Sequence, residues 1–272
     1  MKASVVTPNY NGKEFLKTYF DSLNRNKDFV GEVILVDNGS TDESIEFIKD
    51  YSRNLDFPVI IIRNAENLGF AKAVNQGILK SSYPYIFSLN NDTQVEESGI
   101  KPLIDLISSD DSIFSVASKM VQFDNKNLID DAGDEYNILA WTKKTGENQP
   151  AENYDEVYEI FSSCAGAAMY NKAILDKIGL FDENFFAYME DVDLSYRAKI
   201  NGYKNLFCPD SVVYHIGSAT SGSRYNKFKV KLAARNNVWT VYKNFPIPQK
   251  ILNFIFLFLG FLIKYLFFVK KG

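Results

Sequence analysis

The first third of the chain alternates short apolar runs with amphipathic segments. Apolar runs bounded by turn residues predict strands at Ser4–Thr7, Glu32–Val36, Pro58–Ile62 and Tyr85–Leu89. The segments between them predict helices at Glu14–Asn24, Asp42–Arg53 and Phe70–Lys80. Ser40 precedes Glu43 by three residues, which predicts a capping box at the start of the second helix. Strands alternating with helices of this length indicate an α/β protein with a doubly wound, mostly parallel sheet.

The pattern is less regular after about residue 110. Residues 124–151 are polar and rich in turn formers, which predicts a surface excursion. Beyond it we expect a helix at Glu190–Asn201, short strands at Lys204–Cys208 and Ser211–Tyr214, a small polar loop at 218–223 and a basic helix at Lys227–Tyr242.

The tail is a third kind of segment, because Ile251–Val269 is almost unbroken in its apolarity. As a helix it would be about 28 Å long, close to the roughly 30 Å of a bilayer's hydrocarbon core. Lys250, Asn253, Lys264 and Lys271 would share one side, and such a polar stripe favours a helix lying in the membrane interface. We therefore expect 246–272 to be a membrane-associating helical tail, in plane or single-pass, with packing on the domain itself as the remaining possibility.

The net charge of −4 conceals an uneven distribution. Residues 1–210 carry 20 basic and all 34 acidic side chains, a net of −14, and the remaining residues carry ten basic side chains. A basic, apolar tail on an acidic body predicts contact with an anionic membrane surface and not with nucleic acid. The two cysteines have no metal-binding spacing and are typical of reduced thiols in a cytosolic compartment.

Candidate chemistry gathers where the predicted strands end. The fourth strand runs into Asn90-Asn91-Asp92, and the first two run into Pro8–Gly12 and Asp37–Ser40. Parallel strands end at the same sheet edge, where open α/β sheets bind ligands. A second acidic group, Glu190–Asp193, and the single histidine, His215, follow later in the chain. Together these residues suggest a metal–phosphate site with a base.

Six segments in this order resemble family 2 glycosyltransferases of the GT-A fold, and the resemblance extends from residue 3 to about 245. The segments are Ser4–Asn11, Val36–Asp42, Asn67–Ala71, Leu89–Asp92, Gly166–Met169 and Glu190–Leu194. The branch resembled is that of bacterial rhamnosyl- and galactofuranosyltransferase-like enzymes. The resemblance implies a GT-A domain over 1–245, with a nucleotide-sugar half at 1–123 and an acceptor and catalytic half at 124–245.

The resemblance implies that Asp37 recognises the nucleotide base while Pro8 and Tyr10 pack around base and ribose. The other nucleotide-sugar contacts that it implies are Asn11, Asn38, Ser40, Asn67, Gly69, Phe70, Asn75, Asn90 and Asn91. Plainer alternatives remain open. Asp37 and Ser40 also suit a turn that satisfies backbone amides, and Gly69 suits the start of a helix.

Asn90-Asn91-Asp92 occupies the place of the family's Asp-x-Asp signature, which binds a divalent ion on the sugar-nucleotide diphosphate. The chain departs from that pattern because Asn90 is uncharged. The resemblance therefore implies Asp92 as the main ligand, with His215 and the Asn90 carbonyl oxygen beside it, and Mn²⁺ or Mg²⁺ as the cofactor. A strand-end histidine with a structural role is the alternative for His215.

The resemblance implies that Asp191 is the general base and that Glu190 orients the acceptor or Asp191. One base and no covalent sugar–enzyme stage would invert the anomeric configuration. Asp193 and Arg197 are spaced as a structural i, i+4 pair.

The expected function is an inverting glycosyltransferase that uses a dTDP- or UDP-linked sugar and a lipid-linked saccharide acceptor in cell-surface polysaccharide synthesis. The expected location is the cytoplasmic face of the bacterial inner membrane. The rival hypothesis is a catalytically inactive nucleotide-sugar-binding or scaffold subunit, for which Asn90 is the support. A nucleotidyltransferase is disfavoured. It would need a glycine-rich, basic phosphate loop after the first strand, and that loop here has one glycine, Gly12, and one lysine, Lys13. The sugar, the linkage and the oligomeric state do not follow from the sequence.

Overall fold

The computed structural model describes residues 1–216 and 227–271. Its core is a mixed sheet with the strand order β10-β12-β6-β11-β4-β1-β2-β3, to which β5 and β7 add at one end, and a separate β8–β9 hairpin. The strands are β1 (Ala3–Asn9), β2 (Val30–Asp37), β3 (Val59–Arg63), β4 (Tyr85–Leu89), β5 (Thr93–Val95), β6 (Ile113–Gln122), β7 (Ile129–Asp131), β8 (Asp134–Tyr136), β9 (Thr142–Lys144), β10 (Tyr158–Ile160), β11 (Ala167–Asn171) and β12 (Lys204–His215).

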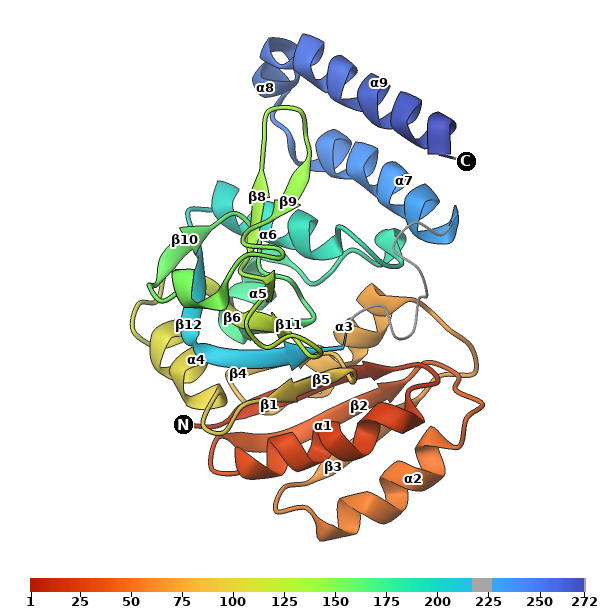
Figure 1. The fold of residues 1–272 in the computed structure, drawn as a ribbon, viewed down its shortest axis with the longest axis vertical. Coiled ribbons are helices and arrows are strands. Elements are labelled where there is room, and N and C mark those ends of the chain that lie inside the picture. The colour runs from red at the N-terminus through yellow and green to blue at the C-terminus, as the bar shows by residue number, and fades with distance from the viewer. Residues whose placement is uncertain (217–226, 272) are drawn as a thin grey trace.

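Helices cover both faces of this sheet (Figure 1). They are α1 (Lys13–Arg25), α2 (Ser44–Tyr51), α3 (Phe70–Lys80), α4 (Ile100–Ile107), α5 (Lys172–Ile178), α6 (Glu190–Ile200), α7 (Lys227–Asn244), α8 (Ile247–Leu252) and α9 (Phe254–Lys271), with 3-10 turns η1 (Ser52–Asn54), η2 (Ala151–Asn153) and η3 (Glu183–Phe185). Alternation along the strands builds one core on each face. Val5 packs with α1, α2 and α4, whereas Val6 packs with α3, α5 and α6.

The predicted doubly wound sheet is present, but it is parallel only in part. β4, β1, β2 and β3 pair in parallel, as do β6 and β12. β11 lies antiparallel between β4 and β6 and separates these two parallel groups. The prediction of a mostly parallel sheet was therefore wrong for the second half, whose connections lack the strand–helix rhythm of the first.

Other predictions from local sequence also need correction. The capping box at Ser40 is wrong, because Glu43 adopts a left-handed conformation (φ 63°) and α2 begins only at Ser44. The Asp42 carboxylate instead accepts the Ser44 N–H. The two strands expected at 204–214 form the single strand β12, whose pairing with β6 shifts register between Cys208 and Val212. The predicted loop at 218–223 lies outside the described residues.

Residues 124–151 do more than form a surface excursion. They contain β7, which joins the main sheet beside β6, and the β8–β9 hairpin. Figure 1 shows this hairpin reaching away from the sheet toward α8 and α9. Trp141, near its tip, donates its Nε1–H to the Gly260 carbonyl of α9 at 3.2 Å. The segment therefore connects the main sheet to the tail.

The tail divides into α8 and α9, where one helix was expected. One side of α9 packs on the domain, where Leu257 joins a buried cluster with Ala140, Tyr196 and Phe245. Lys264 faces the Trp141 ring at 5.6 Å, so a member of the predicted polar stripe points at the protein. Burial lowers the pKa of Lys264 to about 8. Within the described residues, no helix is long and apolar enough to cross a membrane.

Candidate functional site

Three strand ends meet at one polar centre, as the sequence predicts. The Asn9 amide, at the end of β1, donates to Asp37 Oδ1 at 2.9 Å and accepts from Asn91 Nδ2 at 2.7 Å. Gly12 approaches this centre so closely that a Cβ there would lie 2.0 Å from Asn91 Nδ2. Sequence reasoning missed Asn9, although its position at the strand end was available as an indication.

Asp37 and Ser40 form the turn that follows β2. Asp37 Oδ2 accepts the Ser40 N–H at 3.2 Å, and Ser40 Oγ accepts the Asn11 N–H at 2.9 Å. These contacts match the interpretation of Asp37 and Ser40 as a turn whose side chains satisfy backbone amides. Beside it, Pro8 is partly exposed and Tyr10 is 38% exposed, so both offer surface to a ligand.

Asn38 and Asn67 organise the segment before α3. Asn38 Nδ2 donates to the Gly69 carbonyl at 3.1 Å, and Asn67 Oδ1 accepts the Gly69 N–H at 2.9 Å. Gly69 has φ +89°, and a Cβ there would lie 2.6 Å from the Phe186 carbonyl oxygen. The close approach that requires glycine is thus to the loop before α6.

Phe70 and Asn75 on α3 face the protein. Phe70 packs against the core on the α3 face of the sheet. Asn75 is buried and exchanges hydrogen bonds with the Phe181 backbone at 2.8 and 3.1 Å. Asn75 therefore joins α3 to the segment that follows α5.

The predicted metal ligands Asp92 and His215 lie together. Asp92 directly precedes β5, and His215 ends β12 opposite Thr93 of β5. His215 Nε2 is 3.6 Å from Asp92 Oδ1, a buried carboxylate oxygen without a hydrogen-bond partner. The backbone of Asn90, the third expected ligand, bonds to two other residues. Its N–H donates to the Gly166 carbonyl at 2.9 Å, and its main-chain carbonyl accepts the Thr93 hydroxyl at 2.6 Å.

Asp130, from β7, completes the surroundings of His215. Its Oδ2 is 2.7 Å from His215 Nδ1, which leaves Nε2 directed at Asp92. Lys144 of β9 lies 3.4 Å from the same Asp130 oxygen and 3.6 Å from Asp131 Oδ2. Burial lowers the pKa of His215, but the carboxylates of Asp130 and Asp92 outweigh burial and raise it to about 9. Sequence reasoning missed Asp130 and Lys144, because the polar segment that holds them shows no periodicity.

These residues fit a divalent ion that is shared with a diphosphate. A buried carboxylate oxygen without a hydrogen-bond partner lies 3.6 Å from an imidazole nitrogen, and phosphate-bound Mg²⁺ or Mn²⁺ sites use few protein ligands. In the part of the chain that the structure describes, no three His, Cys, Asp or Glu side chains are arranged to hold a metal by themselves.

Glu190 and Asp191 form the first turn of α6, where the helix dipole favours carboxylates. Burial raises the pKa of Asp191, against the opposing effects of the Ala165 and Val192 N–H groups and the Lys144 charge. Burial raises the pKa of Glu190 well above its ordinary value, and the Asp191 charge adds to this. Glu190 Oε2 is buried without a hydrogen-bond partner, so its environment favours the neutral acid.

Glu190 and Asp191 are therefore adjacent acids in different environments.

The predicted ion pair of Asp193 and Arg197 is confirmed, with 3.0 Å between Asp193 Oδ2 and Arg197 Nε. The Lys144 charge lowers the pKa of both Asp131 and Asp191, against the raising effect of burial, so it acts electrostatically on the His215 cluster and on the start of α6.

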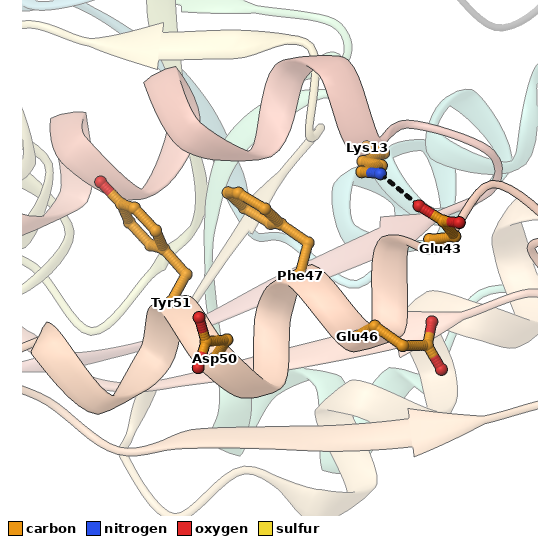
Figure 2. Close-up of a pocket in the computed structure, with 6 residues that line it drawn as sticks. All are labelled: Lys13, Glu43, Glu46, Phe47, Asp50 and Tyr51. Carbon is orange, nitrogen blue, oxygen red and sulfur yellow. Dashed lines mark hydrogen bonds and ion pairs between the residues drawn. The ribbon is translucent and has the colours of Figure 1, made fainter.

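A surface hollow of about 250 Å³ lies elsewhere, between α1 and α2 (Figure 2). Figure 2 shows the Lys13–Glu43 ion pair at one end and the rings of Phe47 and Tyr51 along it. It contains none of the predicted site residues and only exposed charges at its rim, so it is not the candidate site.

Two relatives illustrate what the chain is similar to. The poly-beta-1,6-N-acetyl-D-glucosamine synthase of Staphylococcus aureus (strain COL) is 23% identical over 219 residues, which are 80% of this chain and 50% of that protein. The chain thus spans about half the length of that relative. The N-acetylglucosaminyl-diphospho-decaprenol L-rhamnosyltransferase of Mycobacterium tuberculosis (strain CDC 1551 / Oshkosh) is 24% identical over 268 residues, which are 86% of this chain and 85% of that protein.

Solved structures share the fold. GalNAc-T7 with UDP, GalNAc and Mn²⁺ has a TM-score of 0.73 at 21% identity, and the match covers 89% of this chain and 48% of the GalNAc-T7 chain. The mannosyltransferase PcManGT from Pyrobaculum calidifontis with GDP-Man and Mn²⁺ has a TM-score of 0.67 at 14% identity, covering 100% and 76%. S. aureus TarS 1–349 with UDP-GlcNAc has a TM-score of 0.63 at 17% identity, covering 97% and 72%.

The family follows from a match that takes in well over half of the chain. The model described as "Glycosyl transferase family 2" matches residues 4–179, from β1 through α5. The mixed sheet agrees with the GT-A structures above, and the strand-end centre lies within the matched residues. The chain belongs to glycosyl transferase family 2 and has the GT-A fold.

Proposed function

We propose that this protein is a metal-dependent, inverting glycosyltransferase. It transfers a sugar from a dTDP- or UDP-linked donor to a hydroxyl group of a lipid-linked saccharide in the synthesis of a cell-surface polysaccharide. The observation that carries the proposal is the buried Asp92 oxygen, which has no hydrogen-bond partner and lies 3.6 Å from His215 Nε2 at the edge where three strands end. The S. aureus relative is named as the synthase of a polysaccharide, and the M. tuberculosis relative as a rhamnosyltransferase that acts on a diphospho-decaprenol-linked sugar; these names support the substrate class.

The nucleoside part of the donor binds beside the Asp37–Ser40 turn. Tyr10 and Pro8 supply exposed surface for the base, and Asn11, Asn38 and Asn67 line the neighbouring segments. Base recognition by Asp37 requires the ligand to share the oxygens that now accept from Asn9 and Ser40. Asn90 and Asn91 lie between this region and the diphosphate end.

Asp92 and His215 hold the divalent ion, with the Asn90 carbonyl oxygen and the donor diphosphate as further ligands. When bound, the ion neutralises negative charge on the departing nucleoside diphosphate. Asp130 takes the Nδ1 side of the imidazole and thereby directs Nε2 to the ion site, as second-layer carboxylates do for metal-binding histidines.

Asp191 is the general base. The acceptor oxygen bonds to the anomeric carbon as the bond from that carbon to the diphosphate oxygen breaks, and the electron pair leaves with the nucleoside diphosphate. The acceptor proton passes to the Asp191 carboxylate, whose raised pKa strengthens it as a base. Glu190, held in its neutral form, orients Asp191 or the acceptor.

The tail holds the enzyme at the cytoplasmic face of the bacterial inner membrane. The side of α9 opposite Leu257 exposes apolar residues, among them Ile255 at 69%, Leu259 at 43% and Leu266 at 56%. An apolar helix face of this size suits the interfacial layer of a bilayer. The lysines contribute less than the sequence suggested, since Lys243 pairs with Asp182 and Asp193 and Lys250 donates to the Tyr242 carbonyl.

Replacing Asp130 tests the ion site without removing a ligand. We expect Asp130→Ala to weaken Mn²⁺ binding about 10- to 100-fold, because the imidazole loses the partner that orients it. Mn²⁺ is titrated by electron paramagnetic resonance, with and without UDP. Asp124→Ala is the matched control, because Asp124 lies exposed in the same segment. Equal Mn²⁺ affinity in Asp130→Ala and wild type would contradict the assignment.

Replacing Asp191 tests the base. Asp191→Asn should lower nucleoside diphosphate release by about 10²- to 10⁴-fold while leaving donor binding intact, because only proton transfer is lost. Glu190→Gln should lose far less, because the amide resembles the neutral acid that burial favours. Release is followed with UDP-N-acetylglucosamine, UDP-glucose and dTDP-rhamnose. An Asp191→Asn protein as active as wild type would exclude Asp191, and an inactive wild type that still bound a donor would favour the scaffold hypothesis.

Serine at the exposed α9 positions tests the tail. The triple variant Ile255→Ser, Leu259→Ser, Leu266→Ser should bind vesicles containing phosphatidylglycerol at least about tenfold more weakly, because each buried apolar side chain contributes about 1.5–3 kcal/mol. Leu79→Ser on α3 is the control, since Leu79 is 74% exposed away from the tail. If the triple variant co-sedimented with these vesicles as fully as wild type does, the membrane role would be rejected. The same holds if the variant lost self-association but kept its vesicle binding.

A further inference from the structure

The loop before α6 has an unusual backbone. Phe186, Tyr188 and Met189 all have positive φ angles, of 65°, 69° and 72°, although none is glycine. Such conformations cost energy and persist only where surrounding contacts hold them. Met189 is the N-cap residue of α6, and Glu190 and Asp191 follow directly as its first two residues. The shape of this loop therefore sets where the proposed base lies.

Asn236 of α7 holds this loop through its side-chain amide. Its Nδ2 group lies within hydrogen-bond distance of three loop carbonyls, those of Phe185 (2.9 Å), Ala187 (2.9 Å) and Tyr188 (2.7 Å). The side chain is fully buried. Carbonyl oxygens only accept hydrogen bonds, so the amide nitrogen and not the amide oxygen must face the loop.

Arg235 fixes the orientation of that amide and adds to the grip. Its Nε donates to Asn236 Oδ1 at 2.9 Å, and its Nη2 donates to the Asn184 and Phe185 carbonyls at 2.6 and 3.1 Å. Two adjacent residues of one helix thus lie within hydrogen-bond distance of the carbonyls of residues 184, 185, 187 and 188. This set of contacts exceeds what packing α7 against α6 alone requires.

The opposite side of the loop contacts the donor half. The Phe186 carbonyl accepts the Ala71 N–H at 3.3 Å, and Gly69 packs against the same carbonyl and ring. The loop therefore lies between the start of α3, where the donor is proposed to bind, and the Arg235–Asn236 pair. Its conformation controls the separation between the donor and the base.

We propose that Asn236 is a positioning residue, which holds the 185–189 loop, with its three positive-φ residues, in place and so sets Asp191 at the reacting carbon. The proposal rests on the proposed function of Asp191. Asn236 touches neither donor nor acceptor, and it acts through the loop backbone. Displacement of a base by about 1 Å can lower a rate about 100-fold without changing substrate binding.

Asn236→Asp is the sharpest variant, because aspartate has the shape of asparagine but no N–H to donate to the three carbonyls. Asn244→Ala is the matched control. Asn244 is also a buried asparagine of α7, but it donates to Asp193 and not to the loop. A role confined to stability would lower folding stability in both variants alike.

The first readout needs no substrate. Hydrogen–deuterium exchange of the folded full chain should be at least about tenfold faster in peptides covering 185–191 of Asn236→Asp than in wild type, because the loop carbonyls lose their donor. Peptides covering β12 should be unchanged, and Asn244→Ala should leave 185–189 unchanged. Wild-type exchange in 185–191 of Asn236→Asp would overturn the proposal.

The second readout is donor hydrolysis, in which water takes the place of the acceptor hydroxyl, measured with the fastest of the three donors named above. Asn236→Asp should lower kcat about 100-fold with KM changed less than about threefold. An unchanged kcat, or a rise in KM that accounts for the whole loss, would overturn the proposal. Asp191→Asn, assayed in parallel, separates the two questions, because full activity in that variant refutes the base while the exchange experiment still reports on Asn236.

Discussion

The paired hydrogen bonds of Asn9 hold the ends of β1, β2 and β4 together. The Asn9 side chain donates to Asp37 at the end of β2 and accepts from Asn91 beyond β4, so one amide joins three strand ends. The parallel register of β1 with β2 and β4 brings those ends to the same edge. Everything proposed for the donor depends on this geometry, because Tyr10, Ser40 and Asp92 are each within a few residues of one of the three ends.

The second half of the sheet reaches the same edge by a different arrangement of strands. β11 runs antiparallel between β4 and β6, and β12 then lies parallel to β6 and delivers His215 beside Asp92. β7 pairs with β6 and places Asp130 against the other imidazole nitrogen. His215 of β12 thus contacts residues beside β5 and in β7. Lys144 pairs with Asp130 and also acts electrostatically on Asp191 at the start of α6.

Sequence reasoning succeeded where local pattern and tertiary structure agree. The range predicted for β4 and that for α3 match the structure, and the expected meeting of strand ends is confirmed by the contacts of Asn9. It failed where a local rule competed with another interaction. Ser40 has the spacing of a capping box, but its hydroxyl serves the Asn11 backbone instead. Asp130 and Asn236 could not be predicted, because their partners His215 and 185–188 lie far away along the chain.

The central claim is that this edge binds a nucleoside diphosphate sugar together with a divalent ion. The most direct test is calorimetric titration of UDP-, dTDP- and GDP-linked sugars into wild type and Asp92→Ala, each with and without Mn²⁺. The account predicts that one donor binds wild type tightly only when Mn²⁺ is present, and that this binding is lost in Asp92→Ala. Binding that is indifferent to both Mn²⁺ and Asp92, or the absence of binding by any donor, would contradict it.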